Sequence, residues 1–169
     1  MRSRHAPILE TRPFSWPHEA GCAAFATALA QQTGLRQAYV ELHGPLGAGK
    51  TTFVRHLLRA LGVSGRIKSP TYTVVEPYTL PGLDVDIWHF DFYRFSDPRE
   101  WEDAGFREIF AAPGLKLAEW PEKAGDTLPV ADLRLHITPQ LDDSRLVQAE
   151  ACTPLGQTLL AGIVGIMGA

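Results

Sequence analysis

The hydrophobic residues of this chain follow two different periods. Residues 131–138 alternate strictly between apolar and polar side chains, which predicts a strand. Residues 145–152 alternate similarly, so the two segments predict an antiparallel hairpin with one polar face near a sheet edge. From Phe53 onward the apolar residues instead recur at helical spacing until Gly62, which predicts an amphipathic helix that ends there.

Shorter runs of β-branched and apolar residues predict further strands. These runs are residues 38–42, 73–75, 83–93 and 115–120. Pro77 and the turn-forming residues 80–82 interrupt the chain between the second and third runs, which predicts an antiparallel pair joined by a turn. Pro121 stops the last run. Strands that alternate with helical segments in this way predict one α/β domain, residues 1–169, with a mixed, partly parallel sheet.

The two ends of the chain have different signals. Residues 1–14 are interpreted as an extension with a strand near residues 7–9, and Ser15 is the expected cap of a helix that runs to about Gln32. The tail, residues 153–169, is apolar, glycine-rich and uncharged from Leu155 onward. It is shorter than the roughly 20 residues that cross a bilayer, so we expect no membrane span. A packed or frayed end is the simpler interpretation, and a membrane or partner contact is the alternative.

A short helix is predicted where residues 97–100 read Asp-Pro-Arg-Glu. Asp97 can cap it, Pro98 suits the first helical position, and Glu100 completes a capping box. Gly105 ends this helix, and residues 106–111 are expected to form another turn or two.

The strongest chemical signal is the segment 44–52, which matches the pattern G-x-x-x-x-G-K-[ST]. Its glycines allow a backbone whose N–H groups surround phosphates. Lys50 can reach the β- and γ-phosphates, and the Thr51 hydroxyl can join the coordination shell of Mg²⁺. Because a strand precedes the loop and a helix follows it, the context is that of a P-loop NTPase-like three-layer sandwich. The expected ATP-binding residues in the loop are Gly44, Pro45, Leu46, Gly47, Ala48, Gly49, Lys50, Thr51 and Thr52.

Two carboxylates at strand ends are candidates for metal or water chemistry. Asp91 ends a run of strand-like residues and is favoured over Asp84 and Asp86 as the second protein ligand of Mg²⁺. A solvated carboxylate at a strand end is the alternative for Asp91. Glu119 follows a buried-looking strand, where it could orient water or bind metal directly or through water. Its structural alternatives are a loop cap or an ion pair with Arg94 or Arg107.

The segment Ser69-Pro70-Thr71-Tyr72 is a third candidate. Hydroxyl groups in a loop after the phosphate-binding helix are suited to sense a γ-phosphate, as in switch loops. A common turn is the competing interpretation.

Composition limits the other possibilities. The 169 residues are 45% hydrophobic and 21% charged, and the formal net charge is −3. This charge argues against a wide basic surface that would hold nucleic acid by itself, so we expect RNA contact only through a partner. The only cysteines are Cys22 and Cys152, and neither they nor the six scattered histidines form a recognised metal motif.

With these residues in view, the chain resembles the TsaE (YjeE) family from about residue 15 to residue 138. The resemblance rests on four blocks in the family's order, residues 44–52, 68–78, 89–94 and 119–122. It implies a cytoplasmic, Mg²⁺-dependent P-loop ATPase of tRNA threonylcarbamoyladenosine biosynthesis. Such a protein binds TsaB and TsaD; TsaD transfers the threonylcarbamoyl group, while the TsaE-like component hydrolyses ATP and resets the assembly.

The resemblance also implies roles for particular residues. Lys50 and Thr51 would hold phosphate and Mg²⁺, while Asp91 and Glu119 would serve in metal or water-activating roles. Thr71 falls in the switch-like loop with Ser69 and Tyr72. Trp120 follows Glu119 in its block, and Glu19 would border the adenine. Pro45 replaces the family's usual Asp, with little expected loss of phosphate binding because it lies at the start of the loop.

Two other functions remain open at this stage. A small-molecule kinase would need an arginine-bearing lid, which Arg94, Arg99 or Arg107 could supply, although their segment is predicted to be a capped helix. A nucleotide-gated binding module would bind ATP without meaningful catalysis. For the ATPase we predict slow turnover of the isolated protein, since its own loop carries no obvious arginine finger.

Overall fold

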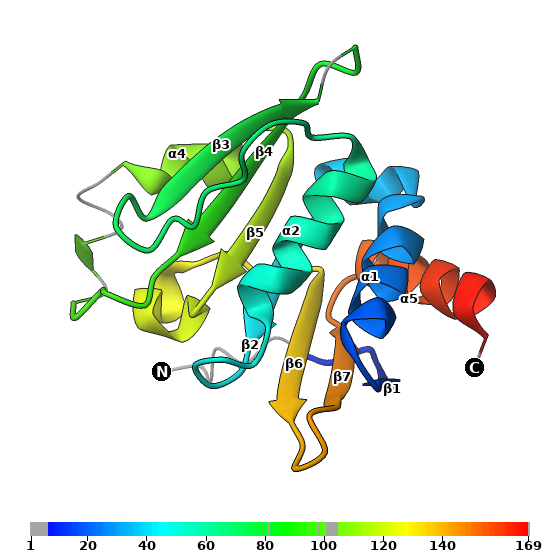
Figure 1. The fold of residues 1–169 in the computed structure, drawn as a ribbon. Helices are drawn as coiled ribbons and strands as arrows, with labels where there is room; N and C mark the ends of the chain where they lie inside the picture. Colours follow the sequence, from blue (N-terminus) through cyan, green and yellow to red (C-terminus); the bar gives the residue numbers. More distant parts are fainter. Residues whose placement is uncertain (1–6, 81, 98, 101–104, 169) are drawn as a thin grey trace.

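A computed structural model describes residues 7–80, 82–97, 99–100 and 105–168 of the chain. Its strands form one seven-stranded sheet in the order β1-β7-β6-β2-β5-β4-β3 (Figure 1). The strands are β1 (Glu10–Trp16), β2 (Tyr39–His43), β3 (Val75–Leu80), β4 (Val85–Asp91), β5 (Leu115–Glu119), β6 (Leu133–Pro139) and β7 (Arg145–Ala151). The helices are α1 (Glu19–Ala30), α2 (Lys50–Leu61), α4 (Phe106–Ala111) and α5 (Pro154–Met167), with 3₁₀ segments η1 (Thr33–Gln37) and η2 (Pro121–Thr127).

The sheet is covered on both faces, which gives three layers. Helices α1, α2 and α5 pack on one face over the larger hydrophobic cluster, which includes Phe25, Phe53 and Leu135. On the other face, α4 and η2 cover a smaller cluster around Phe90 and Phe92. In β4 and β5 the side chains alternate between the two clusters, as the two-residue period of a strand requires: Ile87 and Leu117 enter the larger one, and Phe90 and Ala118 enter the smaller one. The predicted α/β architecture with a mixed sheet is confirmed.

The centre of the sheet is parallel. β2 pairs in parallel with both β5 and β6, and β5 pairs in parallel with β4. The carboxyl ends of these strands therefore meet at one edge, where ligands of open α/β sheets usually bind. The β3–β4 and β6–β7 pairs are antiparallel, as predicted. The β6–β7 hairpin lies near the sheet edge, as predicted, and β1 pairs with β7 to form the outer strand.

The beginning of the chain differs from the sequence interpretation. The strand expected near residues 7–9 lies at Glu10–Trp16, and Ser15, the expected helix cap, is inside it. Helix α1 begins at Glu19 with His18 in the capping position. Pairing with β7 explains the difference, because it buries Trp16 to 2% exposure against Phe25 and Phe53. The hydrophobic gain of this long-range contact outweighs a local capping signal.

Pro77 was also misinterpreted as a strand breaker. Strand β3 runs through it, and Pro77 is opposite Trp88 of β4. β3 lies at an edge of the sheet, where a residue without an N–H group leaves no neighbouring carbonyl unpaired. Most of the helix predicted after Asp97 falls outside the described residues. Its capping box is visible, because the Asp97 N–H donates to Glu100 Oε1 at 3.1 Å and the Arg99 N–H donates to Asp97 Oδ1 at 2.9 Å.

The apolar tail forms helix α5 and packs against α1 and β7 (Figure 1). Thr153 caps this helix by accepting a hydrogen bond from the Gly156 N–H, and Leu159, Leu160 and Ile163 are fully buried. In the described part of the chain, no helix combines the length and the apolar character needed to cross a membrane. The tail thus completes the helical layer that covers one face of the sheet.

Candidate nucleotide and metal site

The segment that connects β2 to α2 has the backbone of a phosphate-binding loop. Gly44 has φ 152° and Gly49 has φ 106°, which are conformations that residues with a side chain rarely adopt. A Cβ atom at Gly44 would lie 2.5 Å from the carbonyl oxygen of Ile137, so this glycine also allows a close approach of β6. The loop leads directly into α2, whose first N–H groups lack partners within the helix.

A pocket of about 370 Å³ opens above this loop. It is lined by residues 46–49, by the first residues of α2, and by Asp91, Glu119 and Arg145. A second cavity of about 180 Å³ adjoins it on the side of β1 and α1, where Trp16 and Glu19 contribute to its wall. The two cavities share Ala48, Gly49, Thr52 and Arg145. We refer to these two adjoining cavities together as the recess; one has a polar lining and the other a partly aromatic one.

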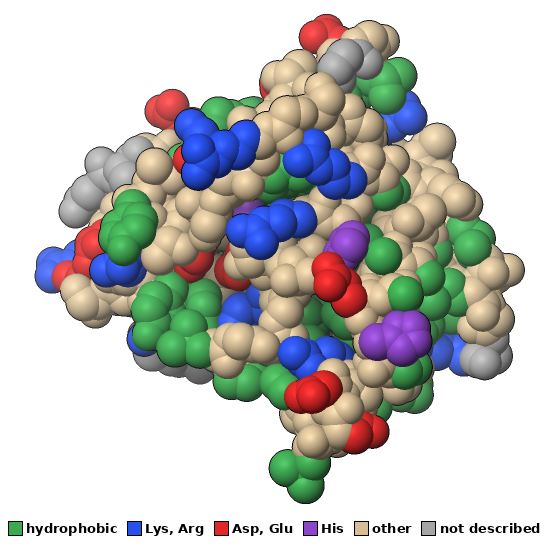
Figure 2. All heavy atoms as spheres, viewed as in Figure 1, with side chains coloured by type: hydrophobic (Ala, Val, Ile, Leu, Met, Phe, Trp, Pro, Cys, Tyr) green, Lys and Arg blue, Asp and Glu red, His purple; other side chains and the backbone are tan. Residues whose placement is uncertain are grey.

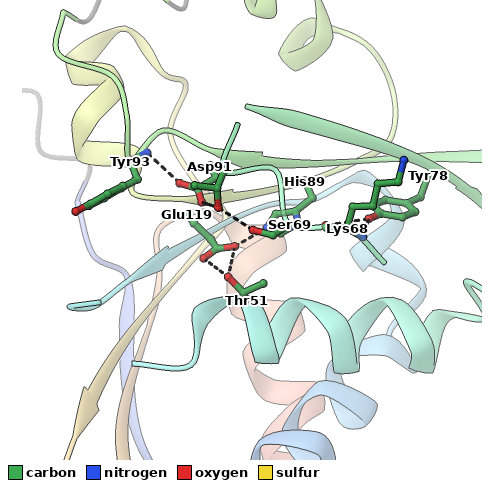
Figure 3. Close-up of polar contacts among 9 residues, drawn as sticks. Thr51, Lys68, Ser69, Tyr78, His89, Asp91, Tyr93 and Glu119 are labelled. Carbon is green, nitrogen blue, oxygen red and sulfur yellow. Dashed lines mark hydrogen bonds and ion pairs between the residues drawn. The ribbon is translucent and has the colours of Figure 1, made fainter. Parts of the chain in front are cut away.

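The two predicted carboxylates lie side by side in this recess. Asp91 is the last residue of β4 and Glu119 the last of β5, and they are direct partners in the parallel register. The Thr51 hydroxyl donates to the Glu119 carboxylate, at 2.8 Å from Oε1 and 3.0 Å from Oε2 (Figure 3). Asp91 accepts from the Tyr93 N–H at 2.9 Å and, more weakly, from the Thr71 hydroxyl at 3.4 Å. The structure therefore brings the loop helix, two strand ends and the predicted switch segment together.

Comparisons with known proteins agree with this geometry. The family model described as threonylcarbamoyl adenosine biosynthesis protein TsaE matches residues 16–147. The chain belongs to the TsaE family. It is 43% identical over 122 residues to the tRNA threonylcarbamoyladenosine biosynthesis protein TsaE of Haemophilus influenzae, covering 72% of this chain and 75% of that protein. The corresponding TsaE protein of Streptomyces coelicolor is 32% identical over 130 residues, covering 76% of this chain and 87% of its own.

A solved structure shares the fold. The crystal structure of Bacillus subtilis YdiB superposes with a TM-score of 0.77 at 24% identity, covering 94% of this chain and 97% of that one. At this coverage the likeness extends over nearly the whole chain, and it shows the fold. The family and the fold thus agree with the resemblance seen in the sequence.

Lys50 is folded back onto the loop of this TsaE family member. Its Nζ donates to the carbonyl oxygen of Gly44 and, at 3.2 Å, to that of Pro45. The same nitrogen lies 3.8 Å from the ring centroid of Trp120, a cation–π contact, and Lys50 is only 5% exposed. Burial lowers the pKa of Lys50, and the charges of Glu119 and other nearby carboxylates oppose that shift.

The carboxylates are also perturbed by their environment. Burial raises the pKa of Asp91, and the negative charge of Glu119 adds to the rise. The hydrogen bond from the Tyr93 N–H acts in the opposite direction because it favours the charged form. A bound cation would offset the repulsion and the desolvation of these two adjacent carboxylates.

The donor set fits Mg²⁺ bound together with a nucleotide. In the described residues, no three His, Cys, Asp or Glu side chains form a metal-binding group by themselves. Mg²⁺ at phosphate sites, however, usually takes one or two protein carboxylates and completes its shell with phosphate oxygens and water. Thr51, Asp91 and Glu119 offer only oxygen atoms, which are the ligands this ion prefers.

Several predicted residues lie at the margin of the site. Glu19 borders the second cavity and contacts His56 Nε2 at 2.9 Å. Ser69 exchanges a hydrogen bond with Thr71 at 2.8 Å, so the switch segment reaches the pocket through Thr71. Tyr72 is 82% exposed, and the Arg94 guanidinium lies over its ring at 4.4 Å. Arg94, one of the two arginines expected as an ion-pair partner of Glu119, thus contacts Tyr72. Glu119 instead contacts Thr51 and His89.

Two residues near the pocket were not identified from the sequence. Arg145 donates from Nε to the carbonyl oxygen of Ala48 at 2.9 Å and lines both cavities. Only the pairing of β6 with β7 brings it to the loop, so no local pattern could have indicated it. His89 contacts Glu119 within the core; its signals in the sequence were a polar residue inside an apolar strand and its place at the start of the family block 89–94.

Proposed function

We propose that this protein binds ATP with Mg²⁺ in the recess above residues 44–52 and hydrolyses it slowly. In this proposal it is the nucleotide-driven component of tRNA threonylcarbamoyladenosine synthesis, acts on TsaB- and TsaD-like partners, and leaves the group transfer to them. The observation that carries the proposal is the convergence of Thr51, Asp91 and Glu119 beside Lys50 in one pocket. Family membership supports the pathway.

The side chains of the pocket suggest a division of roles. Lys50 would leave the carbonyl oxygens of Gly44 and Pro45 and neutralise the β- and γ-phosphates. Thr51 and Asp91 would hold Mg²⁺, which supplies charge stabilisation to the transferring phosphoryl group when bound. Glu119, freed from Thr51, would orient the attacking water or join the metal shell. The second cavity, with Trp16 and Glu19, has a partly apolar wall suited to the nucleoside.

Contacts of two of the three candidate lid arginines support hydrolysis over a kinase reaction. Arg94 stacks on Tyr72, and Arg99 pairs with Asp97 at 3.0 Å, so neither arginine extends over the phosphate pocket as a lid. A lid arginine is the part that a small-molecule kinase would need to stabilise transfer to a bound substrate. Transfer of labelled γ-phosphate to a metabolite instead of water would support the kinase.

Partner binding is the second part of the proposal. Basic side chains gather over α2 on one face of the molecule (Figure 2). The exposed residues there include Arg55 and Arg59, whose charges lie near Tyr78, and Lys68, whose N–H donates to the Tyr78 hydroxyl at 3.2 Å. With a net charge of −3 overall, this limited patch suits an acidic protein surface better than direct binding of tRNA. We place this activity in the cytoplasm, with tRNA reached through the partners.

Two experiments test these parts separately. Release of labelled phosphate from ATP by the purified protein should be Mg²⁺-dependent and well below ~10 s⁻¹, as for switch-type NTPases without an activator. Absence of any hydrolysis, with tight ATP binding retained, would favour the binding module. Incubation with purified TsaB and TsaD, with ATP or ADP, should give a complex whose stability depends on the nucleotide. Failure to bind under either condition would refute the partnership.

A further inference from the structure

We propose that His89 is a positioning residue that holds the Glu119 carboxylate in its working orientation. This inference rests on the hydrolysis proposed above and adds a residue to that site. His89 touches neither the loop nor the pocket surface, and it acts only through Glu119.

His89 lies on the same face of the sheet as the two carboxylates. It is in the middle of β4, two residues before Asp91, and its register partner in β5 is Leu117. The side chain is completely buried, at 0% exposure. Burying an imidazole in an otherwise apolar layer costs free energy unless its nitrogen atoms are hydrogen-bonded. A leucine or phenylalanine would fill such a position at lower cost, so the polar side chain calls for an explanation.

Only one of its two nitrogen atoms has a partner. His89 Nε2 is 2.6 Å from Glu119 Oε2, while Nδ1 is buried with no hydrogen-bond partner among the described residues (Figure 3). A carboxylate accepts hydrogen bonds, so Nε2 carries the hydrogen and Nδ1 presents only a lone pair. An unfilled acceptor is tolerated more easily than an unfilled donor. The hydrogen bond that the imidazole makes is thus the one that it donates to Glu119.

Among the described residues, this bond is the side-chain contact of the Glu119 carboxylate that nucleotide binding would leave in place. In the described part of the chain, the second side chain that donates to the Glu119 carboxylate is the Thr51 hydroxyl, which contacts both carboxylate oxygens. In the proposed complex Thr51 turns to the metal, so it can no longer restrain Glu119. His89 would then be the remaining side chain that fixes the direction of the carboxylate. Outer partners of this kind commonly change metal affinity or activity by about 10- to 100-fold when removed.

A matched pair of substitutions separates this role from a packing role. In His89→Gln the amide nitrogen can occupy the place of Nε2 and donate to Glu119, whereas in His89→Asn it reaches only the place of Nδ1. We expect His89→Asn to lower kcat by about 10- to 100-fold and His89→Gln to stay within about threefold of the wild type. The same contrast should appear in the tightening of ATP binding by Mg²⁺, measured with a fluorescent ATP analogue. Binding of ADP without Mg²⁺ should be unchanged in both variants.

The outcomes distinguish this inference from the proposed function. The positioning role would be overturned if His89→Asn kept the wild-type kcat and the wild-type effect of Mg²⁺ on ATP binding. It would also be overturned if His89→Asn and His89→Gln both folded and lost kcat equally. If His89→Asn does not fold, His89→Gln decides alone: wild-type behaviour supports the role and a loss of more than about tenfold overturns it. If the wild type binds ATP with Mg²⁺ but releases no phosphate, the proposed hydrolysis fails, while the Mg²⁺ effect on binding still tests His89.

Discussion

Replacing Lys50 with methionine should separate the chemistry of the pocket from the stability of the fold. Methionine has a similar volume and keeps the aliphatic part of the side chain, but it removes the cation. In the free protein, Lys50 makes two hydrogen bonds to loop carbonyls and one contact with the Trp120 ring, at 5% exposure. In the proposed complex the same charge instead faces the phosphates.

The expected magnitudes differ between the two states. In the free protein, the cation–π contact stabilises by about 0.5–2 kcal/mol and the hydrogen bonds add a similar amount. Desolvation of the ammonium group, which also lowers its pKa, offsets most of this gain. We therefore expect Lys50→Met to change the free energy of unfolding by less than about 1.5 kcal/mol. Loss of a charged hydrogen bond to phosphate, by contrast, costs about 1.5–3 kcal/mol, which weakens ATP binding about 10- to 150-fold.

Lys116 supplies the matched control. It is 6% exposed, its Nζ donates to the carbonyl oxygen of Ala112, and it lies 5.4 Å from the Trp88 ring centroid. Burial lowers its pKa as it does for Lys50, but its side chain is on the opposite face of β5 from Glu119. Calorimetric titration should show weak ATP binding for Lys50→Met and wild-type binding for Lys116→Met. Equal ATP affinity in all three proteins would refute the assignment of Lys50 to the phosphates.

Three further substitutions test other parts of the account. Asp91→Asn should abolish Mg²⁺-dependent hydrolysis yet raise the melting temperature of the free protein by about 1–4 °C at pH 7, since it removes a buried charge whose pKa is raised. The difference in melting temperature between Asp91→Asn and the wild type should grow from pH 4 to pH 7. The pKa of Asp91 is raised in the folded state, so its ionisation destabilises the wild type as pH rises through that pKa. A constant or reversed difference in thermal melts would contradict this reasoning. Gly44→Ala should destabilise by about 1–3 kcal/mol in urea unfolding, because its Cβ would meet the Ile137 carbonyl, and a neutral effect would show that β6 can move away. Leu160→Ala, in the fully buried face of α5, should cost about 2–5 kcal/mol, whereas a loss under 1 kcal/mol would mean that α5 is not part of the core.

The central part of the fold was predictable because its signals are local. The loop pattern, the strand before it and the helix after it are contiguous, so spacing alone located them. The ends of β4 and β5 at Asp91 and Glu119 followed from apolar runs that stop at carboxylates. These elements then meet because parallel strands place their carboxyl ends at one edge of the sheet.

The remaining features depend on contacts between distant segments. The capping signal of Ser15 was outweighed by pairing of β1 with β7, which is more than a hundred residues away and could not be identified from local spacing. Arg145 reaches the loop only through that same part of the sheet. The role of His89 could not be predicted for the same reason: the sequence does not contain the register between β4 and β5, which brings its side chain to the Glu119 carboxylate.

A single-turnover assay with γ-labelled ATP, comparing the wild type with Glu119→Gln, tests the central claim most directly. Both proteins should bind ATP at similar affinity in the absence of Mg²⁺, because the substitution keeps the shape of the side chain. The wild type should then release labelled phosphate slowly, and Glu119→Gln should retain the bound nucleotide intact. Equal phosphate release by the two proteins, or failure of the wild type to bind ATP, would contradict the account.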